Sequence, residues 1–299
     1  MTVVQLENCQ LSRIRAGSPR RGGADGRCDD HPMLLDVAFG STPGRSPLPD
    51  PADSADPADR WLRAVALGGQ GRYARARAAL DDLERRPGLD PALASLASST
   101  RASLLRQLGG HAKASEYDGA ALALLGSSGP DDRRWHEARC DALTGLAADA
   151  LGCGRLALGR RLLERCAAHL AGVGDEDALW RQHVRLDWVT AEIALASGDF
   201  ATATTRTDSA VARSTEHPSV RHRVKSALLS AAAATGLPTS DRAIETARAV
   251  LADSGTHGLL PLRWAAAMLL DGVSPDPAVR TVRDECAAEI AHRGGRFAK

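Results

Sequence analysis

Apolar residues return every three or four positions from Pro57 to the end of the chain, and polar residues fill the positions between them. This spacing is typical of amphipathic α-helices. Three Asp-Pro pairs, beginning at Asp56, Asp90 and Asp276, mark helix starts, because aspartate caps a helix and proline fits its first turn. The predicted helices, taken as consecutive pairs, cover residues 57–69 with 72–86, 91–108 with 111–125, 132–151 with 155–171, 177–197 with 200–214, 219–235 with 240–253, and 260–271 with 277–293.

No segment alternates apolar and polar residues as a half-buried strand does, so we predict an all-α fold without a sheet. Within four helix pairs a small residue is followed by a glycine seven positions later and an alanine five positions after that. The four sets are Ala64, Gly71 and Ala76; Ala102, Gly109 and Ala114; Gly145, Gly152 and Ala157; and Ala191, Gly198 and Ala203. A small residue lets two helices approach closely, and a glycine lets the chain turn between them. The pattern therefore predicts stacked helical hairpins.

The first unit, residues 64–80, resembles a tetratricopeptide repeat (TPR), with Gly71 and the aromatic Tyr73 at the turn. The resemblance extends over residues 57–253. It implies a right-handed α-solenoid of antiparallel helix pairs, with about five to six repeats and a degenerate last pair as a cap. The turn glycines stand 38, 43, 46 and 38 residues apart, against about 34 in the family. Longer helices or loops must absorb the excess; the alternative is a generic alanine-rich helical bundle.

Residues 1–56 differ from the rest and are predicted to form a disordered N-terminal extension to the helical repeat domain of residues 57–299. Residues 41–56 are rich in Pro, Asp, Ala and Ser, a composition that cannot bury a core. We therefore expect residues 1–56 to be dispensable for folding. Residues 33–39 form a short apolar island with two open interpretations. The island docks on the helices, or Met33 is the true start and residues 1–32 come from upstream sequence.

Composition narrows the class of protein. Hydrophobic residues make up 43% of the chain and aromatic residues 3%, so the core must consist mainly of Ala, Leu and Val. The net charge of +1 argues against general attraction to nucleic acid or membranes. No apolar run approaches the roughly 20 residues of a membrane helix, and no signal peptide is visible, so we expect a cytoplasmic protein. The six cysteines lack CxxC or zinc-site spacing, which favours reduced thiols.

No motif in the chain carries recognisable catalytic chemistry. Glu289 and His292 form a single ExxH motif, whereas a di-iron bundle needs two such motifs and further glutamates. The GxSxG, GxxxxGK[ST] and GxGxxG patterns are absent from the sequence. We therefore predict a protein that is not an enzyme, with no catalytic residues, no metal and no cofactor.

Arginines and tryptophans recur in the first helices of the pairs. Arg139, Arg185 and Arg223 each stand thirteen residues before a turn glycine, and Trp61 and Trp188 stand ten before one. In the TPR family the first helices line the concave face, so the resemblance implies a column of arginines beside tryptophans there. Guanidinium groups bind carboxylates with two hydrogen bonds, which favours an acidic peptide as the ligand. The alternative places the arginines wherever water reaches and the tryptophans in the core between repeats.

These observations favour a protein–protein interaction scaffold or adaptor that binds a peptide or helix on its concave face. A second hypothesis is a ligand-sensing module of the kind found in bacterial regulators. The polar, proline-rich residues before Pro57 cannot form a helix-turn-helix, which argues against direct DNA binding. An all-helical enzyme is the third and weakest hypothesis.

Overall fold

The computed structural model describes residues 30–46, 48, 56–127 and 129–298. This part of the chain is all-helical: it contains thirteen α-helices and one short 3-10 helix, and no strand. The predicted all-α fold is therefore confirmed. The helices are α1 (Asp30–Phe39), α2 (Pro57–Gly69), α3 (Tyr73–Glu84), α4 (Pro91–Arg106), α5 (His111–Leu124), α6 (Arg133–Gly152), α7 (Leu156–Val173), α8 (Trp180–Ala196), α9 (Phe200–Thr215), α10 (Val220–Ala233), α11 (Asp241–Thr256), α12 (Leu260–Val273) and α13 (Pro277–His292), with η1 (Ala234–Gly236) after α10.

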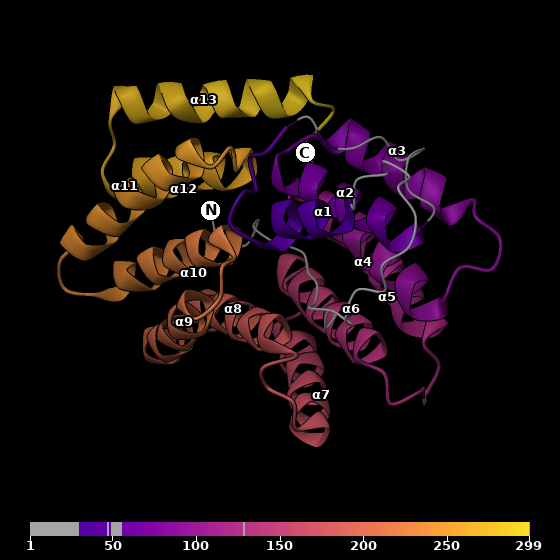
Figure 1. The fold of residues 1–299 in the computed structure, drawn as a ribbon. Coiled ribbons are helices and arrows are strands. Elements are labelled where there is room, and N and C mark those ends of the chain that lie inside the picture. The colour runs from indigo at the N-terminus through magenta and orange to yellow at the C-terminus, as the bar shows by residue number, and fades with distance from the viewer. Residues whose placement is uncertain (1–29, 47, 49–55, 128, 299) are drawn as a thin grey trace.

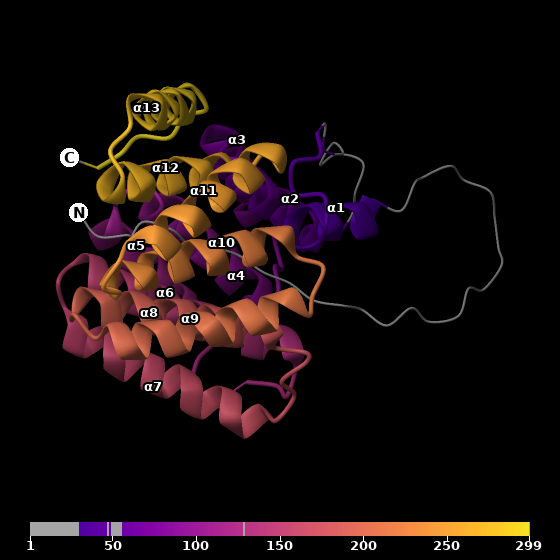
Figure 2. The ribbon, with the colours of Figure 1, turned by 90° about the vertical axis from the view of Figure 1, so that its left-hand side faces the viewer.

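From α2 onward the helices pack in consecutive pairs. The first helix of each pair also contacts the first helix of the next, from α2 through α4, α6, α8 and α10 to α12. We call these six helices the inner layer. The pairs follow one another around a common centre, from α2 and α3 through α7 to α12 and α13 (Figure 1). Figure 2 shows the second half of the chain as successive layers, from α7 through α9 and α10 to α13.

The residues after α13, at the end of the helical array, form hydrogen bonds with α3 and the α2–α3 turn at its beginning. Arg293, just after α13, accepts a hydrogen bond from the backbone of Ala74 in α3 at 3.0 Å and donates one to the Gln70 carbonyl at 2.7 Å. The Gly294 carbonyl accepts a hydrogen bond from Arg77 at 2.9 Å. We call this junction of the α2–α3 turn with α12 and the end of α13 the seam. It closes the array into a ring, which the sequence did not predict.

The buried small residues keep a constant spacing through five pairs. In each pair, a small residue of the first helix and one twelve positions later in the second helix are buried. The pairs are Ala64 and Ala76, Ala102 and Ala114, Ala147 and Gly159, Ala191 and Ala203, and Ala231 and Ala243. Small buried residues at both positions let the two helices of a pair approach closely, so helices with few aromatic residues can still form a core.

The repeat frame predicted for the third unit is wrong by two residues. The residue with left-handed backbone at this turn is Gly154, with φ +73°, and Gly152 is still helical. Ala157 is exposed, whereas Gly159 is buried. Gly145 and Gly152 instead allow α6 to pack closely on α5. A Cβ at Gly145 would collide with the Asp118 side chain, and one at Gly152 with the His111 ring.

Ala203→Leu and Ala157→Leu test this corrected frame with one substitution at two positions. Ala203→Leu is expected to destabilise the fold by about 1–3 kcal/mol, because Ala203 is fully buried against the neighbouring helix. Ala157→Leu is expected to leave the urea midpoint almost unchanged, because Ala157 faces solvent. Equal losses of stability in the two variants would contradict the corrected frame.

The extension predicted to be disordered through residue 56 is partly folded. Residues 30–39 form α1, which packs against α2 and α10, and Leu34, Val37, Ala38 and Phe39 are at most 5% exposed. The apolar island therefore docks on the helices, and the domain boundary at residue 56 is wrong for residues 30–46. Residues 1–29, 47 and 49–55 of the extension lie outside the described residues. The sequence reasoning failed here because it judged composition over 56 residues, whereas four apolar side chains in one helix suffice for docking.

Candidate functional site: the inner layer and helix α1

Phe39, the last residue of α1, is held by side chains from three helices of the inner layer. Its ring centroid lies 6.0 Å from that of Trp61 in α2 and 6.4 Å from that of His222 in α10. The guanidinium of Arg181 in α8 lies 4.9 Å from the ring centre, within cation–π range. The next residue, Gly40, accepts a hydrogen bond from the Val220 backbone at 3.1 Å. The end of α1 is thus anchored to parts of the chain far apart in sequence.

An aromatic cluster continues from His222 away from Phe39. The His222 ring stacks on Trp188 at 5.3 Å and lies edge-on to Trp180 at 5.0 Å. Its Nδ1 lies 2.7 Å from the Ser219 hydroxyl. Burial, followed by the charges of surrounding Arg and Lys side chains, holds the pKa of His222 well below its usual range. The imidazole beside Phe39 is therefore neutral near pH 7.

The segment after α1 is fixed by specific hydrogen bonds. We call residues 40–45 the strap. The Gln70 side chain donates to the Pro43 carbonyl at 2.9 Å and to the Arg45 carbonyl at 3.0 Å. Gly44 lies so close to the α11–α12 turn that a Cβ would come within 2.7 Å of the His257 carbonyl oxygen. Helix α1 and the strap are therefore bound much as a peptide is, by apolar side chains and backbone hydrogen bonds.

Buried ion pairs connect the helices of the inner layer to one another. Each pair joins one inner helix to the next, and every side chain is at most 3% exposed. We call these pairs the ion-pair ladder: Arg106 with Asp149 at 2.8 Å, Arg181 with Glu137 at 2.8 Å, Arg185 with Asp141 at 2.6 Å, and Lys225 with Glu192 at 3.4 Å. Arg106 also contacts Asp118 of α5, a carboxyl whose pKa burial raises well above its usual value.

The structure places Arg185 inside this ladder rather than on an open surface. Its side chain is 1% exposed, and it donates to Asp141 at 2.6 Å and to the Thr144 hydroxyl at 3.0 Å. The expectation that Arg185 faces a groove is therefore wrong. The inner helices contact each other directly, so a position that an open array would leave accessible is covered here by the next helix.

The other two arginines of the expected column have separate surroundings. Both are half-buried. The Arg139 guanidinium lies 5.2 Å from the Trp135 ring centre, and Arg223 donates to the His217 carbonyl at 2.9 Å. Together with the burial of Arg185, these contacts show that the three arginines do not form one exposed column.

Trp61 and Trp188 lie in the core, as the alternative interpretation of the tryptophans expects. Trp61 is 0% and Trp188 2% exposed. Their indole groups donate across successive inner helices, Trp61 to Thr100 and Trp188 to Ser226, each at 2.9 Å. Trp61 also meets Phe39, so the structure brings one of the predicted site residues to α1.

Sequence reasoning missed the side chains that contact Phe39 besides Trp61, and it missed the carboxylates of the ladder. A signal existed for the latter: Glu137 and Asp141 each stand 44 residues before their arginine partners. For the docking of α1, the sequence signal was the apolar run of residues 33–39.

One group of residues in the described ranges has the composition of a metal site. His31, Asp56 and Asp59 bring their ligand atoms within 4.8 Å of one another. Asp56 already caps α2 by accepting from the Ala58 backbone at 2.8 Å, and His31 Nδ1 lies 2.5 Å from Asp59 Oδ1. These contacts account for the cluster without an ion.

The cysteines of α6 and α7, Cys140 and Cys166, are buried free thiols, and burial raises the pKa of Cys140.

Comparisons with protein-family models, with curated proteins and with solved structures find no match for this chain. Among the described helices, none combines the length and the apolar character needed to cross a lipid bilayer.

Proposed function

We propose that the protein is a non-enzymatic interaction module whose inner layer binds a short helix of a partner protein. We also propose that its helix pairs form a right-handed TPR-like array of five to six repeats. The constant spacing of the buried small residues in five pairs supports the array. The observation that carries the function is α1 itself, an apolar helix of the same chain that occupies the inner layer.

The surroundings of α1 favour a partner helix that is apolar and ends in an aromatic residue. Phe39 is the anchor in α1, and the residues around it are an indole, a neutral imidazole and a guanidinium. We therefore propose an apolar helix as the partner in place of the acidic peptide expected from the sequence. Arg181 and Arg185 already pair with carboxylates of their own chain and are not available to an acidic ligand. Aromatic and Arg side chains in a desolvated centre are the usual source of binding energy at such surfaces.

Cleaving the chain between α1 and α2 tests the proposal. A protease site inserted between residues 49 and 53, outside the described ranges, would turn α1 and the strap into a separate fragment. A labelled peptide of residues 30–46 is expected to exchange into the cleaved protein, measured by fluorescence anisotropy. The Phe39→Ala peptide is expected to bind about tenfold more weakly or worse. The Ser46→Ala peptide, changed at an exposed position, is the matched control and should bind as well as the parent.

Two results would contradict the proposal. Either the original fragment stays attached in a large excess of the peptide, or cleavage alone unfolds helices α2–α13. In both cases α1 would be a fixed part of the core and not the occupant of a binding surface.

A further inference from the structure

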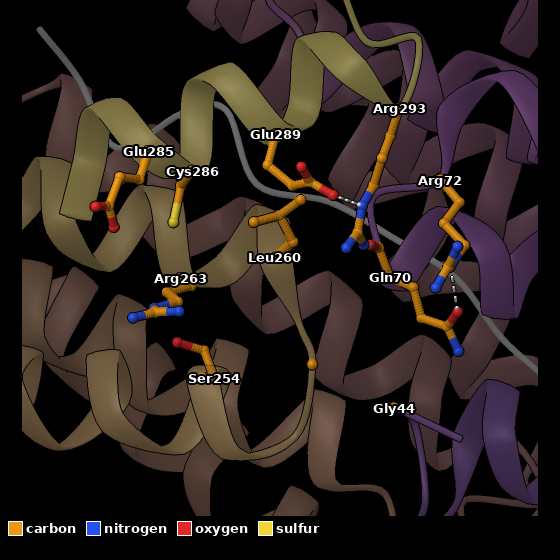
Figure 3. Close-up of a pocket in the computed structure, with 12 residues that line it drawn as sticks. Gly44, Gln70, Arg72, Ser254, Leu260, Arg263, Glu285, Cys286, Glu289 and Arg293 are labelled. Atoms are coloured by element: carbon orange, nitrogen blue, oxygen red, sulfur yellow. Dashed lines mark hydrogen bonds and ion pairs between the residues drawn. The ribbon is translucent and has the colours of Figure 1, made fainter. Parts of the chain in front are cut away.

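A cavity of about 400 Å³ lies at the seam. Its lining comes from four separate parts of the chain: Gly44 of the strap, the α2–α3 turn, the end of α11 with the start of α12, and α13 with the residue after it. Figure 3 shows Arg72, Arg293 and Gln70 at one side, Arg263 with Ser254 and Glu285 at the other, and Leu260 between them. We call this cavity the seam pocket. Its volume is within the range that holds small organic molecules.

Three arginines from distant positions converge on this pocket, and two of them have unused hydrogen-bonding groups. In the described part of the chain, the Arg72 guanidinium donates only through Nε, to the Gln70 side chain at 3.2 Å. The Arg263 side chain has no hydrogen bond or ion pair with any described residue, although its Nε is buried. Arg293 is fixed by Glu289 at 2.5 Å and by the Gln70 carbonyl at 2.7 Å.

The charges of the pocket are unbalanced. Burial, and then the positive charges of Arg293 and Arg75, lower the pKa of Arg72. The nearby carboxylate of Glu289 is already bonded to Arg293 and is shared between the two arginines. The lining also includes Glu285, so three arginines face two carboxylates. An anion placed between Arg72 and Arg293 would balance the remaining positive charge and reduce the repulsion between the two guanidinium groups.

We propose that the seam pocket binds a small organic anion, with a phosphate or carboxylate group held by Arg72 and Arg293 and a second polar group reaching Arg263. Guanidinium groups suit both anions because their paired N–H donors match two oxygens at once. Leu260 forms the apolar wall between the two polar ends. This proposal goes beyond the interaction function, and it favours the ligand-sensing module as a second role for the same chain.

The position of the pocket predicts what the anion does to the protein. Its walls belong to the strap and to the first, fifth and last helix pairs, so a bound anion connects the two ends of the array. A ligand that binds the closed seam and not the unfolded chain must raise the melting temperature with its concentration.

The test titrates the full chain with inorganic pyrophosphate in one arm and citrate in the other, at constant ionic strength. Calorimetry and the melting temperature are the two readouts. We expect saturable 1:1 binding in at least one arm, and the arm that saturates identifies the anion as phosphate or carboxylate. Arg72→Ala and Arg263→Ala are each expected to weaken that binding about tenfold or more.

Arg248→Ala is the matched control, because it removes the same charge from an exposed position of α11 that does not line the pocket. Its affinity is expected to stay within about twofold of the parent. Should Arg72→Ala fail to fold, Arg72→Lys keeps the charge without the paired donors and is still expected to bind more weakly. The proposal is overturned if neither anion binds saturably, or if Arg248→Ala loses as much affinity as the pocket variants.

Discussion

Arg185→Ala is expected to destabilise the fold by about 3–5 kcal/mol, because it leaves the carboxylate of Asp141 buried without its cation. Asp141→Ala should cost a similar amount for the converse reason. A double variant that combines Arg185→Leu with Asp141→Leu should be less damaging than the sum of the two single changes, since no charge is left unpaired. Urea unfolding monitored by circular dichroism measures the parent and the variants.

Arg206→Ala provides the control for this series. Arg206 lies on the outer helix α9, is 48% exposed and pairs with Asp187 at 3.2 Å. Its loss is expected to cost about 1 kcal/mol or less, because the Arg206 side chain is half in water and the buried carboxylate of Asp187 keeps its hydrogen bond from Ser209 at 2.7 Å. If Arg185→Ala is as mild as Arg206→Ala, then Arg185 is accessible in solution, and the groove predicted from the sequence becomes tenable again.

Phe39→Ala is expected to release α1 from the inner layer and to lower the free energy of unfolding by about 3–5 kcal/mol, the usual cost of truncating a buried phenylalanine. Phe39 is 5% exposed and its ring meets side chains of three helices. Hydrogen exchange should show lost amide protection in residues 30–39, with the amides of α4–α8 still protected. This result would also show that part of the N-terminal extension contributes to stability.

Phe200→Ala is the matched substitution at an exposed site, since Phe200 is 39% exposed. It is expected to lower stability much less and to leave the protection of α1 unchanged. Full protection of residues 30–39 in Phe39→Ala would contradict the anchoring role given to this side chain.

Helix starts could be predicted from the sequence because the interactions that fix them are local. Asp56, Asp90 and Asp276 each accept a hydrogen bond from a backbone N–H two or three residues ahead, at the predicted starts of α2, α4 and α13. The frame of the third unit depends on tertiary packing instead. Gly152 and Gly154 both suit a turn, but Gly154 has the left-handed backbone, whereas at Gly152 a Cβ would collide with the ring of His111 from α5.

The site was harder to predict because its residues meet over long distances in sequence. Arg185 is expected at the surface until Asp141, 44 positions earlier, is known to lie against it. Likewise, the docking of α1 depends on side chains from α2, α8 and α10, and two of these helices are far from it in sequence. Local periodicity carries no information about such pairs.

The seam changes how the array responds to force. An open row of helical repeats stretches like a spring and can lose its terminal repeats one at a time. Here Arg293 and Gly294 bind the α2–α3 turn and α3, so neither end pair is a free terminus. Pulling on such a ring does not extend it until the seam breaks. A few hydrogen bonds between the two ends therefore hold the helix array against extension, and their rupture would allow it to stretch.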